Sequence, residues 1–208
     1  MSLYTRYRRA ASAYWNLHRL AMRAGARALT QRVQRMPRQP TWSLGYASMV
    51  EFMTLGTPKQ VPMQAQSIRE PLDQASSLAR LALVTSQPLA TDLWQGEWVA
   101  ARHARTDHVI LYLHGGGYVS GSPRTHRALI GYLSRHAQAR ILALDYRLAP
   151  EHAYPAALED AWAAYWWLLK QNISPNHIAV AGDSAGGGLT LALLMALRDA
   201  GAPLPAAA

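Results

Sequence analysis

The sequence predicts an α/β fold in which helices flank a central, mostly parallel sheet. The segment "HVILYL", residues 108–113, is a continuous apolar run of the kind expected for a strand that is covered on both faces. After it, strand-like runs alternate with segments of helical spacing, which is the order that a parallel sheet requires. Because 50% of the 208 residues are hydrophobic, the chain has enough apolar material to bury a core.

The predicted elements begin with one or two amphipathic helices over residues 3–35, where larger apolar side chains recur mostly at three- and four-residue steps. Prolines within residues 36–77 favour connecting turns with little regular structure, as in a linker or lid. Two antiparallel strands come next, residues 78–85 and 93–102, and a turn at Pro88 joins them. After the strand at 108–113, the predicted elements are strands 139–146 and 177–183 and helices 156–171 and 185–201. We therefore divide the chain into a basic helical region, residues 1–75, and an α/β core, residues 76–208.

Positive charge is concentrated at the start of the chain. The formal net charge is +9, and residues 1–50 contain nine arginines and no acidic residue. The remainder is neutral, with twelve basic and twelve acidic side chains, so we expect no nucleic-acid binding. We interpret the basic segment as a helix packed on the core with a solvated face. Contact with an anionic membrane surface or a partner protein, and a mitochondrial transit peptide, stay open as alternatives.

Two features that the sequence lacks limit the location and the chemistry that we expect. No run approaches the roughly 18 apolar residues that span a bilayer, and the N-terminus lacks the apolar core of a secretory signal, so a cytoplasmic protein is expected. Without cysteine there is no thiol nucleophile, disulfide or thiolate metal site. We predict neither a cofactor nor a metal site.

The stretch "GDSAG", residues 182–186, places Ser184 between two glycines at the end of a predicted strand and the start of a predicted helix. This G-x-S-x-G arrangement makes a tight turn that exposes the serine hydroxyl at the sheet edge. Side chains at Gly182 and Gly186 would collide with the neighbouring strand and helix, so both positions must be small. The sequence therefore predicts a nucleophilic serine near a helix N-terminus, where backbone N–H groups favour negative charge.

The stretch "HGGG", from His114 through Gly115 and Gly116 to Gly117, directly follows the strand at residues 108–113. Consecutive glycines let the main chain approach a substrate with free N–H groups, which an acyl-transfer site needs to stabilise the oxyanion. His114 is interpreted as a structural residue that orients this loop, rather than as a catalytic base.

Three phrases together resemble the hormone-sensitive lipase family of α/β-hydrolases, and its bacterial carboxylesterase branch in particular: "HGGGYVSGSPRTHR", "DYRLAPEHAYPAALED" and "GDSAGGGL". The resemblance implies an α/β-hydrolase fold with an N-terminal cap-like region, and a serine esterase acting on a small-molecule ester. It further implies that Ser184 is the nucleophile and that Gly116, Gly117 and Ala185 donate N–H groups to the oxyanion. Asp183 then belongs to the turn without being the catalytic acid.

The chain departs from that family after the serine. The family's catalytic acid and histidine follow the nucleophile, yet residues 185–208 contain no histidine and only one acid, Asp199, at the far end of a helix. We expect the chain to be truncated at its C-terminal end, with an incomplete sheet and little activity of its own. A non-catalytic small-molecule-binding protein on the same scaffold is the alternative, and a homo-oligomer stays open.

Overall fold

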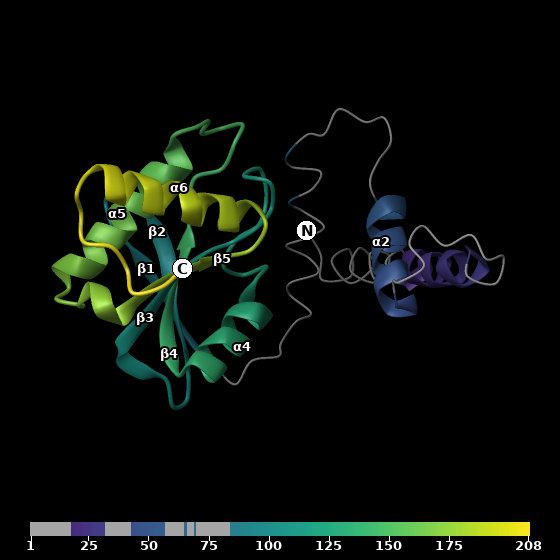
Figure 1. Cartoon of the computed structure of the whole chain (residues 1–208), viewed down its shortest axis with the longest axis horizontal. Coiled ribbons are helices and arrows are strands. Elements are labelled where there is room, and N and C mark those ends of the chain that lie inside the picture. The colour runs from purple at the N-terminus through teal and green to yellow at the C-terminus, as the bar shows by residue number, and fades with distance from the viewer. Residues whose placement is uncertain (1–17, 32–42, 57–64, 66–68, 70–83) are drawn as a thin grey trace, which may run out of the picture. The chain divides into compact units, whose positions relative to one another are not determined.

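The computed structural model describes residues 18–31, 43–56, 65, 69 and 84–208 (Figure 1). The chain divides into two compact units, Met1–Met63 and Gln64–Ala208. The predicted boundary between residues 75 and 76 lies outside the described residues, as does most of the predicted strand at 78–85.

The N-terminal unit contains a helix over residues 18–31 and helix α2, Leu44–Gly56. Helix α2 corrects the expectation of little regular structure in residues 36–77. Its start has a recognisable cap, because the Ser43 hydroxyl accepts a hydrogen bond from the Tyr46 N–H at 3.1 Å. Proline-free sequence between Pro40 and Pro58 leaves room for the helix.

Glu51 joins the two helices of this unit. Its side chain is buried, it lies 3.2 Å from Arg27 Nε, and it accepts a hydrogen bond from Gln31 Nε2 at 3.3 Å. One arginine of the basic segment therefore contacts a carboxylate of α2 rather than solvent alone. Among the described helices, none has both the length and the apolar character needed to cross a membrane.

The second unit is built on a five-stranded sheet with the order β1-β2-β4-β3-β5. The sheet is mixed but mostly parallel, as the sequence predicts: β3 pairs in parallel with β4 and β5, and only β2 runs in the opposite direction, antiparallel to β1 and β4. The antiparallel part arises because the chain reverses directly between β1 and β2. The strands are β1 Val84–Ala90, β2 Gln95–Ala101, β3 Arg105–Leu113, β4 Ala139–Asp145 and β5 Ile178–Gly182.

The predicted turn at Pro88 is wrong. Pro88 lies inside β1, opposite Glu97 of β2, and the reversal instead occurs around Thr91, whose hydroxyl accepts hydrogen bonds from the N–H groups of Leu93 and Trp94. Strand β1 lies at an edge of the sheet, so the N–H groups on one of its sides do not donate to a neighbouring strand. Proline, which has no N–H, is tolerated at such a position.

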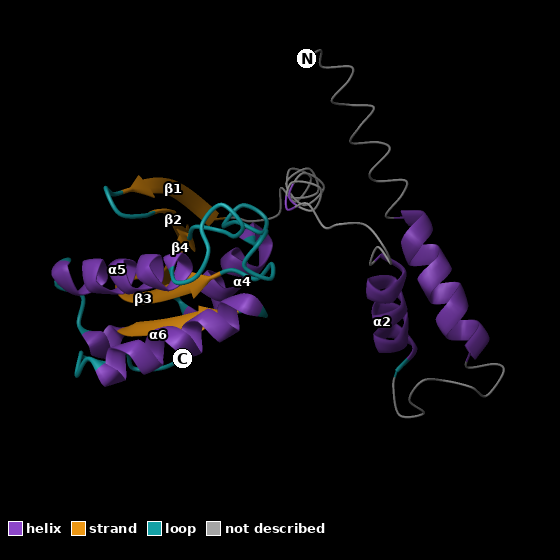
Figure 2. Cartoon of the chain, turned by 90° about the horizontal axis from the view of Figure 1, so that it is seen from above, coloured by secondary structure: helices purple, strands orange, loops and turns teal. Residues whose placement is uncertain are grey.

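Alternating side chains of the central strands form two apolar layers. On β3 and β4, Leu111, Leu113, Leu142 and Leu144 belong to one buried cluster, while their neighbours Tyr112, Ile141 and Ala143 belong to the other. Helices α5, Ala156–Lys170, and α6, Ala185–Asp199, contribute to the first cluster, and α4, Arg127–Ala137, contributes Ile130 to the second. The helices therefore cover both faces of the sheet (Figure 2).

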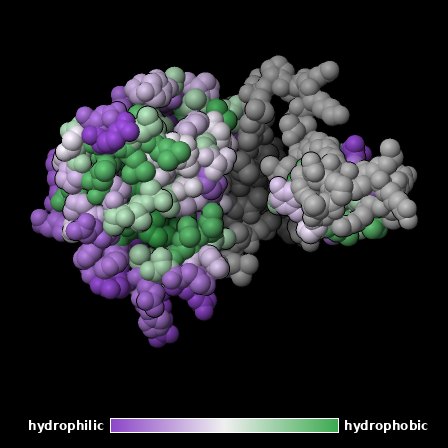
Figure 3. Space-filling model, viewed as in Figure 1, coloured by the Kyte–Doolittle hydropathy of each residue, from purple (hydrophilic) through white to green (hydrophobic). Residues whose placement is uncertain are grey.

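The segments 108–113, 139–146, 156–171, 177–183 and 185–201 are confirmed as the strands and helices that the sequence predicts. The helix α4 has no counterpart among the predicted elements. After α6 the chain returns to the sheet, where Ala207 pairs in parallel with Ala179 of β5. The outer face of α6 carries exposed Leu191 and Met195, and hydrophobic surface is visible on this side of the unit (Figure 3).

Candidate active site

The candidate nucleophile lies where β5 ends and α6 begins. Ser184 is the N-terminal cap of α6, with φ 51° and ψ −117°, and its side chain is exposed. A positive φ at a serine is a strained conformation. Hydrogen bonds hold the turn in this shape, since the Gly186 N–H donates to the Asp183 carbonyl oxygen at 2.8 Å and the Gly188 N–H to the Ser184 carbonyl oxygen at 3.2 Å.

The glycines on either side of Ser184 lie against backbone. A Cβ on Gly186 would overlap the carbonyl oxygen of Leu113, the last residue of β3, and a Cβ on Gly182 would overlap Gly186 itself. The obstructing atoms are main-chain atoms of two elements, so they cannot move aside as a flexible side chain could. The turn therefore requires both glycines for close packing of β3, β5 and α6.

The HGGG loop leaves β3 at the same edge of the sheet. Gly116 and Gly117 have positive φ values of 127° and 65°, and a Cβ on Gly116 would overlap the Ser120 carbonyl oxygen. Within the part of the chain that the structure describes, the N–H groups of Gly116, Gly117 and Ala185 have no hydrogen-bond acceptor. Free backbone donors of this kind are what an oxyanion site needs.

Asp183 connects the serine turn to the HGGG loop. Its Oδ1 accepts hydrogen bonds from the Gly115 N–H at 2.9 Å and from the Tyr112 hydroxyl at 2.6 Å, and its Oδ2 lies 3.5 Å from His126 Nε2. Burial tends to raise the pKa of Asp183, but the Tyr112 hydrogen bond, the nearby His126 and the Gly115 N–H outweigh it and leave that pKa below its usual value. The carboxylate is therefore held ionised, and it fixes the loop beside the serine.

His114 is fully buried at the start of the loop. Its ring stacks on Tyr146 with centroids 4.2 Å apart, and its Nδ1 lies 2.8 Å from the Gly115 carbonyl oxygen. Burial lowers the pKa of His114 to about 4, so the ring is neutral at physiological pH. The hydroxyl of Tyr146, the residue that follows β4, donates to the His114 carbonyl oxygen at 2.6 Å and anchors the loop. These contacts agree with a structural role for His114.

No histidine hydrogen-bonds to the Ser184 hydroxyl among the described residues. His126 faces Asp183 instead, and His177 lies at the opposite end of β5, where its ring stacks on His108. Asp199 ends α6 and pairs with Arg198, far along the helix from the serine. The structure therefore brings together the predicted serine, glycines and Asp183, and it places none of the described histidines or Asp199 as an acid–base partner.

Two residues outside the predicted set stabilise the loop. Tyr112, on β3, reaches Asp183, and Arg69 donates to the Val119 and Ala149 carbonyl oxygens at 2.7 and 2.8 Å. Arg69 also makes a two-pronged ion pair with Glu151, with contacts of 2.9 and 2.8 Å, which lowers the pKa of that carboxyl. No local sequence signal identifies these residues, because their partners lie far away along the chain.

A cavity of about 380 Å³ lies between the HGGG loop, the turn after β4 and α6. Its walls are mostly apolar or aromatic and include Tyr118, Tyr154 and Leu189. The Tyr118 hydroxyl approaches Gly188, four residues after Ser184, so the cavity adjoins the serine turn. A small apolar group fits such a space better than a charged one.

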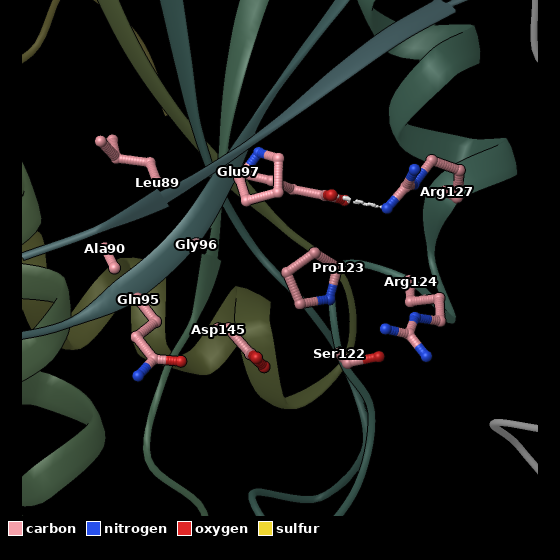
Figure 4. A pocket seen from close by; sticks show the side chains of 11 residues that line it. Leu89, Ala90, Gln95, Gly96, Glu97, Ser122, Pro123, Arg124, Arg127 and Asp145 are labelled. Carbon is pink, nitrogen blue, oxygen red and sulfur yellow. Dashed lines mark hydrogen bonds and ion pairs between the residues drawn. The ribbon is translucent and has the colours of Figure 1, made fainter.

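A second cavity, of about 430 Å³, opens near the carboxyl end of β4 and is polar (Figure 4). Arg127 Nη2 donates to both carboxylate oxygens of Glu97 at 2.6 Å, and Ser86 Oγ donates to the same carboxylate. Ser184 is not among its lining residues. This cavity is therefore separate from the candidate active site at Ser184.

Residues 110–208 match the family model that describes the α/β-hydrolase fold. This segment of the chain is therefore similar to the α/β-hydrolase family, and the predicted fold class is confirmed. Among its relatives, an acetyl-hydrolase of Streptomyces hygroscopicus is 58% identical over 113 residues, which make up 54% of this chain and 37% of that protein.

Two solved structures extend the similarity. An esterase from the bacterial hormone-sensitive lipase family is 46% identical with a TM-score of 0.67, and the match covers 72% of this chain and 50% of that one. The structure EstE5-PMSF is 41% identical with a TM-score of 0.71, covering 80% and 57% respectively. The predicted resemblance to hormone-sensitive lipase esterases is thus confirmed, while this chain spans only about half the length of these two proteins.

Proposed function

We propose that this chain carries the nucleophile and the oxyanion donors of a serine carboxylic-ester hydrolase. The observation that carries the proposal is the exposed Ser184 hydroxyl on a strained turn, beside a glycine loop in which the N–H groups of Gly116 and Gly117 have no described acceptor. The esterase and acetyl-hydrolase relatives support the same class of reaction.

In the proposed reaction, Ser184 Oγ attacks the ester carbonyl carbon while a base takes the hydroxyl proton. The N–H groups of Gly116, Gly117 and Ala185 stabilise the negative oxygen of the tetrahedral intermediate. The alcohol leaves with a proton, and water then hydrolyses the acyl-enzyme to release the acid. Each donor that acts in this way contributes about 3 kcal/mol of transition-state stabilisation.

We further propose that the 208-residue chain alone has little esterase activity. No histidine follows Ser184 in the sequence, and His126 is directed at the Asp183 carboxylate. Without a base the serine hydroxyl is a poor nucleophile, and an enzyme that lacks its acid–base partners keeps about 10³–10⁴-fold acceleration over water.

Both proposals can be tested by adding imidazole as an external base. We expect the purified chain to hydrolyse p-nitrophenyl butyrate slowly, and imidazole in the buffer to raise the Ser184-dependent rate, measured as the difference between wild type and Ser184→Ala. Intact-mass and peptide mapping after treatment with a fluorophosphonate in the same imidazole buffer should place the adduct on Ser184. Equal rates for the two proteins with imidazole, together with no adduct, would overturn the proposed hydrolase. Rapid turnover without imidazole would instead overturn only the proposed low activity.

A non-catalytic binding protein is the second candidate function. The apolar cavity beside the turn and the lack of a described base at Ser184 favour it. Binding of short-chain esters with equal affinity in wild type and Ser184→Ala, with no adduct and no imidazole-dependent rate, is the result expected for this class.

A further inference from the structure

The amino ends of β3 and β5 bring three metal-ligating side chains together, at the edge of the sheet opposite the serine turn. Val109 pairs with Ile178 in the parallel ladder, so His108 and His177 precede paired positions on adjacent strands. Their imidazole rings stack with centroids 4.4 Å apart. Asp107 lies alongside, with its Oδ1 3.2 Å from His108 Nδ1.

One ligand atom from each of Asp107, His108 and His177 lies within 4.8 Å of the other two. A metal ion bound at about 2.0–2.2 Å from each atom needs ligand atoms roughly 3.4 Å apart, so a small rotation of the side chains closes the site. Asp107 and His177 are exposed and His108 is half-buried, which leaves room both for this rotation and for a water ligand.

The Asp107 carboxylate is oriented by its neighbour Arg105. The Arg105 guanidinium donates to both carboxylate oxygens, at 3.1 and 2.9 Å. Each carboxylate oxygen has two lone-pair directions, so accepting a bond from Arg105 leaves one direction for an ion. Carboxylates that bind metals are commonly oriented by such a second hydrogen bond.

We propose that Asp107, His108 and His177 bind a divalent transition-metal ion, with zinc the best match, and that the ion fastens β5 to β3. Two imidazole nitrogens and one carboxylate oxygen form a ligand set suited to zinc and cobalt, whereas calcium and magnesium prefer oxygen ligands alone. His108 and His114 are six residues apart on one extended segment, which places the metal about 20 Å from the HGGG loop. The proposed ion is therefore structural and is independent of the proposed hydrolase.

The test is calorimetric titration of the metal-free 208-residue chain with zinc chloride, and of the variants His177→Gln and His108→Gln. We expect one zinc ion per chain, at least about tenfold weaker binding in either variant, and unchanged binding in the control His136→Gln, which alters an exposed histidine on α4. Visible absorption of the cobalt-loaded protein should change in the two variants and not in the control.

Thermal unfolding provides an independent readout. Zinc should raise the melting temperature of the wild type and of His136→Gln, and should leave that of His177→Gln unchanged, because a ligand that binds only the folded state stabilises it. Zinc binding of equal strength in wild type and His177→Gln would overturn the proposal, and so would the absence of zinc binding by the wild type. Neither result bears on ester hydrolysis, which is measured separately in the Ser184→Ala comparison.

Discussion

The glycines of the serine turn and the single glycine of the helix at residues 18–31 are the same residue type but have different surroundings. A Cβ on Gly186 would overlap main-chain atoms of β3, whereas a Cβ on Gly25, within the helix at residues 18–31, would meet no atom of the described residues within 4 Å. Gly25 only lowers the stability of its helix, whereas Gly186 is required by the close packing around it. The surroundings, rather than the residue type, decide what a glycine does in this chain.

The largest effect is expected at Gly186. Gly186→Ala should lower the free energy of unfolding by about 3 kcal/mol, because the new methyl group overlaps backbone that cannot yield. The matched control is Gly187→Ala in the same helix, where the nearest atom to the new Cβ is 3.4 Å away. There we expect a gain of about 0.5 kcal/mol from the better helix propensity of alanine. Urea denaturation followed by tryptophan fluorescence measures both, and equal effects would contradict the packing explanation.

The next largest effect is expected at Asp183, which fixes the HGGG loop. Asp183→Asn should cost about 1–2 kcal/mol at neutral pH, because a neutral amide oxygen accepts more weakly than a carboxylate from Tyr112 and Gly115, and because the negative charge that faces His126 is lost. The control Asp199→Asn changes an exposed acid that pairs only with its neighbour Arg198, and should shift stability by less than about 0.5 kcal/mol.

The same variant has a predicted pH dependence. The pKa of Asp183 is lower in the folded chain than in the unfolded chain, where it is about 3.9. The ionised carboxylate therefore contributes fully to the free energy of unfolding above the unfolded-state pKa, and this contribution is lost as the pH falls through the folded-state pKa. The stability difference between wild type and Asp183→Asn should therefore shrink on acidification below about pH 4. A difference that is constant across this range would exclude the ionised carboxylate as its source.

A smaller effect is expected at Arg69. Arg69→Lys should cost about 1 kcal/mol, because an ammonium group cannot bind Glu151 with two parallel hydrogen bonds and also reach the carbonyl oxygens of Val119 and Ala149. Hydrogen exchange at the Val119 and Ala149 amides should quicken. Arg124→Lys, at an exposed arginine with no side-chain partner among the described residues, should leave both exchange rates unchanged.

The smallest effect, and one of opposite sign, is expected in the N-terminal helix. Gly25→Ala should stabilise this helix by about 0.5–1 kcal/mol, since no described residue lies where the new methyl group would be. Far-UV circular dichroism of the whole chain during thermal unfolding measures the change. A loss of helix signal would show that Gly25 is packed as Gly186 is, and the contrast between the two regions would then fail.

The elements of the second unit that the sequence predicts are those whose patterns are local and strong. The run at 108–113 and the segment from β5 into α6 combine uninterrupted apolar residues with glycines at fixed positions, so each carries its own signal. Helix α4 lacks such a signal, because no side chain caps its start and Gly131 interrupts it; its burial of Ile130 against the sheet stabilises it instead. Tertiary packing here outweighs local propensity.

The candidate site also contains some residues that the sequence predicts and others that only the structure reveals. Ser184 and the glycines of the two loops follow from short motifs, whereas the side chains that hold these loops in place come from distant parts of the chain. Tyr112 and Asp183 are 71 residues apart, and Arg69 and Glu151 are 82 apart. Only the folded sheet brings such pairs together, so one sequence by itself contains no sign of them.

The positive φ of Ser184 sets stability against function at a single position. Glycine would relieve a backbone strain of about 1–3 kcal/mol there, and it would remove the hydroxyl on which the proposed reaction depends. A screen that rewards heat resistance alone would therefore enrich Ser184→Gly and return robust, inert protein. Directed evolution of this scaffold has to hold that codon fixed, or to select for turnover and thermal tolerance together.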